Sequence, residues 1–360
     1  MSRQGPVGVA FVGCGNISGP YADQMRAGHT DTLKLVGAYD ILPERTRAFA
    51  EKYNVKGYGS PDELLADGEV EAALNITTHT EHAKVTTALL EGGKHVHSEK
   101  PLATTREDGR RIVRLGVEKG LRFGCSPSVI LGEAQQTLKR VVREGLVGEV
   151  KQIYGEMNHG RIETWHPDPE AFYSFGAGPL LDVGGYPLSV ITQVFGSVDW
   201  VRAMGGISLP ERTIGSGSRE GQTYRVTNPD HTVVLMHLAC GALGRLTTSF
   251  FNVRSAQSGI ELHGVDGSIW FESAAGFNAK IRLCKAGQRE WTDVPPDREP
   301  YPGVDFAYGL RNLAEAIREG TPLTCPATAA YHVLDICLSA LEASDSGRTV
   351  NVASTFESVD

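Results

Sequence analysis

The sequence predicts an α/β protein with two domains. The first is expected to hold a parallel, doubly wound sheet, and the second is an α+β domain with a large, mostly antiparallel open sheet. A length of 360 residues exceeds what one hydrophobic core normally supports. The first third alternates short apolar runs with helical patterns, whereas strand patterns dominate after Pro127. We therefore expect one domain over residues 1–125 and another over residues 126–360.

Repeated strand–helix units in the first domain indicate a parallel sheet with helices on both faces. The predicted strands are Val7–Val12, Leu33–Tyr39, Ala72–Thr77, Lys94–His97 and Leu121–Cys125. The predicted helices are Ile17–Ala27, Pro43–Tyr53, Pro61–Ala66, Glu81–Glu91 and Thr105–Lys119.

The second domain begins with a predicted helix over Glu133–Glu144, and strand patterns follow it. The predicted strands are Val150–Asn158, Asp199–Gly205, Thr232–Ala239, Leu243–Phe251, Gly259–His263, Ser268–Glu272 and Ala279–Cys284. Further helices are expected after Asp182 and over Asp305–Glu319 and Ala327–Ser344, and it stays open whether the last two pack back on the first domain. The Gly/Ser-rich stretch Pro210–Pro229 and the Pro-rich stretch Trp291–Gly303 are predicted to be irregular loops.

Composition favours a cytoplasmic protein without a nucleic-acid or membrane partner. The 35 basic and 43 acidic side chains give a formal charge of −8, and no basic run is present. No apolar span is long enough to cross a bilayer, and the first residues lack the layout of a signal peptide. The six scattered cysteines form no CxxC pair, so we expect a reducing compartment and no metal site.

A glycine-rich turn follows the first predicted strand and opens the first predicted helix. Gly13 permits the tight turn, Gly15 lets a pyrophosphate approach the backbone, and Asn16 and Ile17 lead into a helix start that offers N–H groups to this anion. Such a turn is weak evidence alone, but the strand before it and the helix after it favour an NAD(P)-binding Rossmann domain.

An acidic residue, Asp40, directly follows the second predicted strand. An acid there accepts hydrogen bonds from the adenosine ribose and repels a 2′-phosphate, so we expect NAD rather than NADP as the cofactor. Arg45 and Arg47, on the next helix, either soften this preference or simply add surface charge.

Two further polar stretches follow strands at the edge of the sheet where ligands bind in such folds. In NITTHTEH, which starts at Asn75, Thr77 and His82 are placed to line the nicotinamide end of a cofactor; the alternative for His82 is local packing or capping. In HSEKP, which starts at His97, the proline restricts the backbone before it, so we expect Glu99 and Lys100 to face the cofactor crevice.

The second half contains GPLLDVGGYPLS, from Gly178, with Asp182 four residues before Tyr186. Taken with the glycine turn, the Thr77–His82 stretch and Glu99-Lys100-Pro101, this ordered set resembles the Gfo/Idh/MocA family of NAD(P)-dependent oxidoreductases over nearly the whole chain. The resemblance implies hydride transfer between a nicotinamide and a carbinol carbon of a sugar, inositol or related polyol.

The same resemblance implies roles for single residues. Lys100 corresponds to the catalytic-site lysine and Asp182 to its acidic partner. Thr78 stands where the family commonly has proline, and Tyr186 where it commonly has histidine. Tyrosine is used in branches resembling glucose–fructose oxidoreductase, dihydrodiol dehydrogenases and sugar ketoreductases, so the general acid/base role passes to Tyr186.

A tyrosine that acts as a base near neutral pH needs a neighbouring positive charge. Free tyrosine has a pKa near 10, and a neighbouring ammonium lowers the pKa by favouring the phenolate. Lys100 is the expected cation. An adjacent Asp182 would raise the pKa, so we expect it to pair with Lys100 or to bind substrate hydroxyls. We also expect the glycines between the acid and the phenol to let substrate and nicotinamide approach the backbone.

A polar and aromatic stretch, NHGRIETWHPDPEAFY from Asn158, precedes this segment and is a candidate for substrate binding. Its candidate contacts are His159, Arg161, Trp165 and His166, and the two histidines are rival bases to Tyr186. A surface loop around a buried tryptophan is the alternative interpretation.

These residues fit other functions as well. A lyase or glycosidase that oxidises its sugar only transiently would need nearly the same groups, and a non-catalytic NAD-binding sensor would keep the same fold. Apolar strand segments such as TVVLMHLA suit burial on at least one face, so we expect a homo-oligomer, a dimer or a tetramer.

Overall fold

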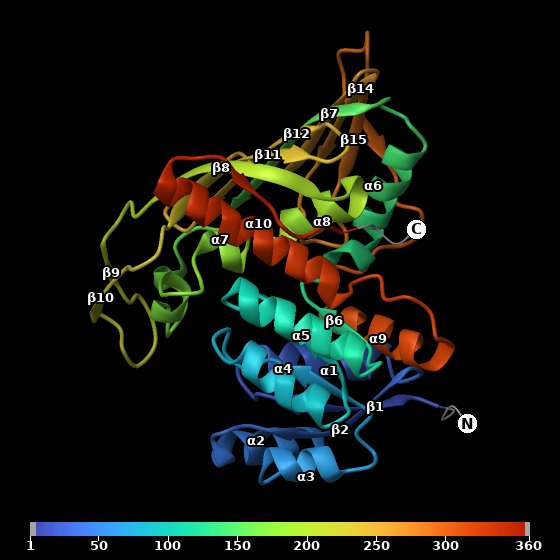
Figure 1. Ribbon diagram of the computed structural model, residues 1–360, viewed down its shortest axis with the longest axis vertical. Helices are drawn as coiled ribbons and strands as arrows, with labels where there is room; N and C mark the ends of the chain where they lie inside the picture. Colours follow the sequence, from blue (N-terminus) through green and yellow to red (C-terminus); the bar gives the residue numbers. More distant parts are fainter. Residues whose placement is uncertain (1–4, 357–360) are drawn as a thin grey trace. The chain divides into compact units, whose positions relative to one another are not determined.

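The computed structural model describes residues 5–356, which fall into two compact units (Figure 1). The first unit comprises residues 5–131 together with Asp305–Tyr331. The second comprises Gly132–Val304 together with residues 332–356. Among the described residues, no helix is both long and apolar enough to span a membrane. The division of function at residues 125 and 126 stays a prediction.

The first unit is built around a six-stranded parallel sheet with the order β3-β2-β1-β4-β5-β6. Because the order reverses between β1 and β4, the loops after these two strands border a crevice at the carboxyl edge of the sheet. The strands are β1 (Val7–Val12), β2 (Leu33–Tyr39), β3 (Lys56–Gly57), β4 (Ala72–Asn75), β5 (His95–Ser98) and β6 (Phe123–Cys125). The helices are α1 (Ser18–Gly28), α2 (Pro43–Tyr53), α3 (Pro61–Ala66), α4 (His82–Glu91) and α5 (Arg106–Glu118). The predicted doubly wound domain is confirmed.

A segment from late in the chain completes the first unit. Helix α9 (Tyr308–Glu319) packs against β2, β5 and β6. Its Leu310 lies in the same hydrophobic core as Phe11. Just before the helix, Asp305 Oδ2 lies 2.8 Å from Nε2 of the buried His29. These contacts place residues 305–331 in the first unit, although they are distant from it in sequence.

The second unit is dominated by a nine-stranded sheet with the order β16-β15-β14-β13-β7-β12-β11-β8-β17. Only β7 and β12 run parallel; the other neighbours are antiparallel. The strands are β7 (Val150–Asn158), β8 (Val198–Gly206), β11 (His231–Leu238), β12 (Leu243–Ser249), β13 (Gly259–Gly264), β14 (Gly267–Phe271), β15 (Ile281–Lys285), β16 (Thr292–Val294) and β17 (Val350–Asn351). The helices are α6 (Glu133–Arg143), α7 (Pro179–Asp182), α8 (Gly185–Phe195) and α10 (Ala327–Ser346), and α10 begins in the first unit. Figure 1 shows α7 and α8 against one face of this sheet. The mostly antiparallel open sheet is confirmed.

Short elements depart from the sequence predictions. The stretch 210–229, predicted as an irregular loop, contains a hairpin of β9 (Glu211–Thr213) and β10 (Thr223–Arg225). The Pro-rich stretch 291–303, also predicted as irregular, contributes β16 to one end of the sheet. Strands this short have too little local pattern to be predicted, because their stability comes from the neighbours they pair with.

A buried histidine fastens the C-terminal segment to the second unit. The backbone N–H of Val198 donates to His332 Nε2 at 3.0 Å, and His332 Nδ1 lies 2.9 Å from Ser354 Oγ. A ring nitrogen that accepts carries no proton, so His332 is neutral and donates from Nδ1. Burial lowers the pKa of this imidazole to about 4.

Replacing His332 by Gln should make the stability of the second unit less dependent on pH. The unfolded chain takes up a proton at His332 near its ordinary pKa, whereas the folded chain does so only near pH 4. Stability is therefore fully present above the ordinary pKa and is lost as pH falls toward 4. The loss from this group is about 2 kcal/mol between pH 7 and pH 5.

The Gln amide keeps an acceptor for Val198 and a donor for Ser354 but does not titrate. Urea unfolding at both pH values, monitored by circular dichroism, checks this expectation. An equal loss of stability in both proteins would show that His332 does not titrate on unfolding.

Candidate active site

The two glycines of the turn after β1 have different surroundings. Gly13 has a φ of +101°, and an added Cβ would lie 2.7 Å from the carbonyl oxygen of Ile76 at the end of the neighbouring strand β4. Gly15 differs, because a Cβ there would meet no protein atom within 4 Å. The absence of a side chain at Gly15 thus leaves space for a ligand, as a bound pyrophosphate requires.

Helix α1 starts directly after this turn. Ile17 occupies the N-cap position and gives no side-chain cap. Within the first turn, however, Ser18 N donates to Gly15 O at 3.1 Å and Pro20 has no N–H, so this helix start offers an anion fewer N–H groups than most. Ser18 is buried, and its hydroxyl donates to the carbonyl of Gly15 at 2.7 Å. The serine therefore closes the turn from within.

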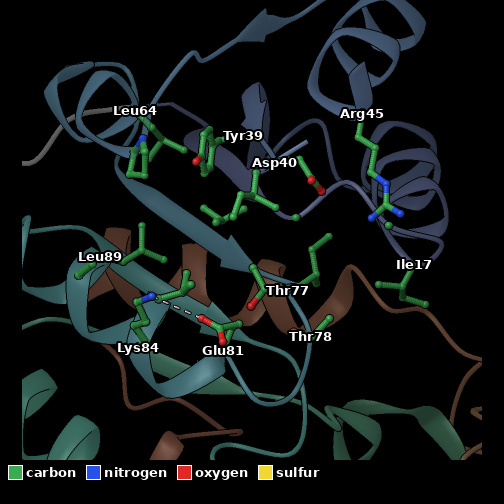
Figure 2. Close-up of a pocket in the computed structure, with 18 of the residues that line it drawn as sticks. Ile17, Tyr39, Asp40, Arg45, Leu64, Thr77, Thr78, Glu81, Lys84 and Leu89 are labelled. Atoms are coloured by element: carbon green, nitrogen blue, oxygen red, sulfur yellow. Dashed lines mark ion pairs between the residues drawn. The ribbon is translucent and has the colours of Figure 1, made fainter. Parts of the chain in front are cut away.

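A cavity of about 620 Å³ opens beside the glycine turn (Figure 2). Its wall includes Gly13, Gly15, Asn16, Ile17, Asp40 and Thr77, all predicted as cofactor contacts. Its other side is formed by apolar residues of α3 and α4 that the sequence did not single out: Leu64, Leu65, Val85, Ala88 and Leu89. A polar turn facing an apolar wall fits the pyrophosphate and adenine of a dinucleotide.

Asp40 and Arg45 share the cavity wall, with opposite charges. Asp40 Oδ2 accepts from Cys14 N at 2.7 Å, and Oδ1 accepts from Leu42 N at 2.9 Å. Each carboxylate oxygen keeps a second lone pair, so Asp40 can still accept from ribose hydroxyls. Figure 2 shows the Arg45 side chain extending from α2 toward the glycine turn. Arg47, by contrast, does not line this cavity.

Thr77 and His82 lie differently with respect to the cavity. Thr77 lines it, and its hydroxyl donates to Asn75 Oδ1 at 2.8 Å. His82 is buried and is not part of the wall. Its Nδ1 lies 2.7 Å from Pro101 O and its Nε2 lies 3.1 Å from Thr77 O. This geometry favours the local packing role for His82, which ties the Thr77 turn to the Glu-Lys-Pro turn.

The Glu-Lys-Pro turn is anchored by a buried polar chain. Glu99 Oε2 accepts from Lys100 N at 3.0 Å, and Oε1 accepts from the hydroxyl of Tyr21 on α1 at 2.6 Å. The Tyr21 hydroxyl also lies 3.1 Å from Ser126 Oγ, which in turn lies 3.2 Å from His97 Nε2. The half-buried Lys100 is thus held through its backbone by a fixed carboxylate.

In the second unit, Asp182 ends α7 and Tyr186 lies in the first turn of α8. Val183 and Gly184 form a turn between the two helices, so the two residues do not lie on one uninterrupted helix. An added Cβ at Gly184 would lie 2.4 Å from the carbonyl oxygen of Leu180. Packing inside the chain therefore requires this glycine, which corrects the expectation that it opens the backbone to substrate. Pro187 is tolerated near the start of α8.

The segment before α7 carries the candidate substrate contacts. Trp165 is 55% exposed, which contradicts the alternative of a buried tryptophan. Its ring meets His159 and His166 edge to face, with centroids 6.4 and 5.4 Å apart. Arg161 Nε donates to Phe251 O at 3.0 Å, and its guanidinium lies over the Phe251 ring. Tyr186 packs against the hydrophobic cluster beneath this segment.

Two family models match the chain. An oxidoreductase family with an NAD-binding Rossmann fold matches residues 7–126, and the GFO/IDH/MocA C-terminal domain matches residues 135–270. The chain belongs to the Gfo/Idh/MocA family of oxidoreductases. This confirms the resemblance inferred from the motifs and shows that the chain is an oxidoreductase with an NAD-binding Rossmann fold.

The relatives of this Gfo/Idh/MocA chain include two dehydrogenases. It is 28% identical over 317 residues to trans-1,2-dihydrobenzene-1,2-diol dehydrogenase from Bos taurus, which covers 86% of both chains. It is 24% identical over 293 residues to levoglucosan dehydrogenase from Pseudarthrobacter phenanthrenivorans, covering 75% of this chain and 71% of that one. A solved structure of levoglucosan dehydrogenase with NADH and levoglucosan gives a TM-score of 0.82 at 19% identity, covering 97% and 100% of the two chains.

Proposed function

We propose that this oxidoreductase transfers hydride between NAD and a secondary alcohol or ketone of a sugar, glycoside or inositol-like polyol. The observation that carries the proposal is a partly buried phenol, Tyr186, in a second unit whose nearby segment exposes aromatic and polar side chains. Ring hydroxyls and the apolar faces of a cyclic polyol match such a surface. The names of the diol and levoglucosan dehydrogenases support the same substrate class.

The proposed chemistry divides the work between cofactor and chain. A bound nicotinamide supplies the acceptor or donor for the hydride. Tyr186 takes the hydroxyl proton during oxidation and returns it during reduction. Lys100 supplies the positive charge that favours the phenolate, and Asp182 orients Lys100 or the substrate hydroxyls. We assign His159, Arg161, Trp165 and His166 to substrate contact.

Replacing Tyr186 by Phe should abolish turnover and leave NAD binding intact. The phenyl ring keeps its packing but cannot exchange a proton, which should reduce kcat by about a hundredfold or more. Nicotinamide absorbance with a panel of sugars, glycosides and inositols measures turnover, and calorimetry measures NAD binding.

Tyr224→Phe is the matched control. Tyr224 lies in the hydrophobic cluster that Tyr186 packs against, and its buried hydroxyl has no hydrogen-bond partner. Near-normal turnover in Tyr186→Phe would refute the assignment and direct attention to His159→Gln and His166→Gln. Product without net change in nicotinamide absorbance would instead indicate a lyase or glycosidase. Nucleotide binding without turnover of any polyol would indicate a sensor.

We also propose that the chain prefers NAD to NADP but retains some affinity for NADP. Asp40 suits ribose hydroxyls and repels a 2′-phosphate, whereas Arg45 on the same cavity wall attracts it. The two side chains act in opposite directions on the same group of the cofactor.

Replacing Arg45 by Ala should weaken NADP binding about tenfold and change NAD binding little, because a charged hydrogen bond to phosphate is lost. Arg47→Ala is the matched control on the same helix, since Arg47 does not line the cavity. Calorimetric titration with each nucleotide needs no substrate. Equal losses of NADP affinity in both variants, or tighter binding of NADP than of NAD by the unaltered chain, would contradict this assignment.

We propose a cytoplasmic homo-oligomer. Met204, Leu235 and Leu243 share one face of the nine-stranded sheet by strand register, and they are 74%, 50% and 56% exposed. The described helices α7 and α8 cover the other face (Figure 1). Charged side chains share this face, since Leu235 pairs with Arg202. An exposed sheet face that carries several large apolar side chains favours association with a second copy. The six free thiols fit a reducing compartment.

Light scattering should give the mass of a dimer or tetramer, and Leu235→Lys should lower that mass, because it replaces an exposed apolar side chain by a second cation beside Arg202. Lys151→Glu is the control for a charge change on an already polar strand position of the same sheet. A monomeric mass for the unaltered chain at micromolar concentration would refute this proposal.

A further inference from the structure

Residues 207–229, within the connection from β8 to β11, run beside residues 158–177, which carry the proposed substrate contacts. We call residues 207–229 the arm and residues 158–177 the substrate segment. The arm donates hydrogen bonds to carbonyl oxygens along this segment. The bonds run from Gly215 N to Glu163 O (2.8 Å), Ser216 Oγ to Trp165 O (2.9 Å), Thr227 N to Tyr173 O (3.1 Å) and Asn228 Nδ2 to Ala177 O (3.1 Å).

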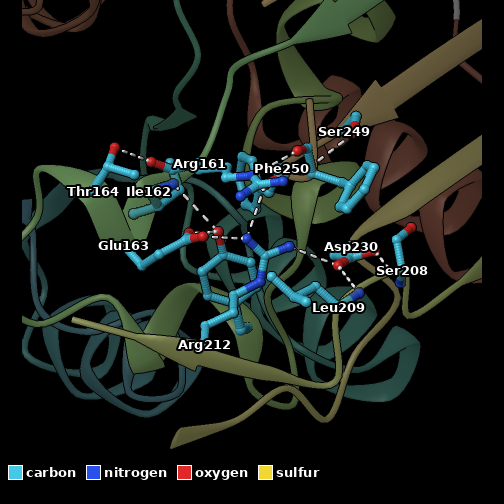
Figure 3. A network of polar contacts seen from close by, with 12 residues as sticks. Arg161, Ile162, Glu163, Thr164, Ser208, Leu209, Arg212, Asp230, Ser249 and Phe250 are labelled. Carbon is cyan, nitrogen blue, oxygen red and sulfur yellow. Dashed lines mark hydrogen bonds and ion pairs between the residues drawn. The ribbon is translucent and has the colours of Figure 1, made fainter. Parts of the chain in front are cut away.

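A buried ionic cluster joins the arm to the substrate segment (Figure 3). Arg212, only 2% exposed, donates from Nη1 to Glu163 Oε1 at 2.6 Å and from Nη2 to Asp230 Oδ2 at 2.7 Å. Nη1 also reaches the carbonyl oxygen of Phe250 at 3.3 Å. The Tyr173 hydroxyl donates to Glu163 Oε2 at 2.6 Å, and the guanidinium lies 4.4 Å from the centre of the tyrosine ring.

Folding stability alone does not explain why this buried ionic cluster is present. Removing three charges from water is costly, and apolar residues of similar volume often stabilise a core equally well. The planar guanidinium donates hydrogen bonds in fixed directions, so it can hold two carboxylates in a defined geometry at once. Arg212 thereby fixes β9, the Glu163 turn and the Asp230 loop in a single arrangement.

The substrate segment has a backbone held by hydrogen bonds from the arm, and it also carries exposed aromatic side chains. The carbonyl of Trp165 is held by Ser216, whereas its indole is more than half exposed. The rings of His159 and His166 meet the indole edge to face, and Phe172 meets His166 in the same way at 4.9 Å. An exposed indole on a fixed backbone offers a ligand an apolar surface, and little conformational entropy is lost when the ligand binds.

We propose that Trp165 stacks on the C–H face of a cyclic polyol and that Arg212 is a positioning residue which acts through Trp165. The inference rests on the proposed function and names a subsite of it. The substrate class is a ring that exposes an apolar face, such as a pyranose or a cyclitol. The arm supplies the rigidity that orients the indole before substrate arrives.

The direct test replaces Trp165 by Leu in the full-length chain. The KM for the polyol that the unaltered chain turns over should rise about tenfold, because one aromatic contact is lost. The KM for NAD should stay unchanged, and kcat should fall much less than kcat/KM. Trp291→Leu is the matched control, because Trp291 is 43% exposed in the same unit but lies outside the substrate segment.

The positioning role is tested by a double-mutant cycle. Arg212→Lys keeps the charge but loses the two-way fork, and Ser216→Ala removes the bond to the Trp165 carbonyl without touching the buried cluster. Each should raise the polyol KM in the unaltered background but not in the Trp165→Leu background. Arg245→Lys is the control, since Arg245 pairs with Glu156 at 2.8 Å on the sheet of the same unit.

The possible outcomes distinguish failure of the Trp165 subsite from failure of the proposed function. No polyol turnover by the unaltered chain would overturn the proposed function and this subsite with it. Turnover with an unchanged KM in Trp165→Leu would overturn the stacking subsite alone. If Arg212→Lys does not fold in a melting scan, Ser216→Ala decides, and KM effects that add fully to that of Trp165→Leu would refute positioning through Trp165.

Discussion

The carboxyl ends of β1 and β4 lie so close together that only glycine fits at position 13. Any side chain there would collide with the backbone of Ile76, and the positive φ would strain it further. This contact sets where α1 begins, and therefore which way its N–H groups face. It also sets where Tyr21 on α1 reaches Glu99. The glycine turn and the Glu-Lys-Pro turn thus depend on one close approach between two strands.

Sequence patterns predicted the parts of the fold that have a strong local signal. Strand β1 was predicted with its observed bounds, because it is a short apolar run that ends at a glycine. The β9–β10 hairpin was missed, because its strands are three residues long within a stretch rich in Gly and Ser. The placement of α9 in the first unit was left open, because an amphipathic pattern does not identify the partner of its apolar face.

In the candidate site, too, some residues could be predicted from the sequence and others could not. Residues of the glycine turn were predictable, because their conformation and their proposed ligand demand particular residue types. The apolar wall from α3 and α4 was not, since Leu64 or Leu89 on an amphipathic helix reads as ordinary core. Gly184 was interpreted as space for substrate, whereas the Leu180 carbonyl occupies that space. A glycine in a sequence signals a close approach but does not say to what.

In each unit, a hydrogen bond between a tyrosine and a carboxylate lies close in sequence to a residue with a proposed role. Tyr21 donates at 2.6 Å to Glu99, which precedes Lys100, and Tyr173 donates at 2.6 Å to Glu163, which lies shortly before Trp165. Hydrogen bonds to an ionised carboxylate are short and strong, and burial makes any other arrangement costly. In the second pair, burial and Glu163 raise the tyrosine pKa, so the donor keeps its proton. Rigid polar contacts behind a site hold the backbone still while its outward side chains stay available to ligands.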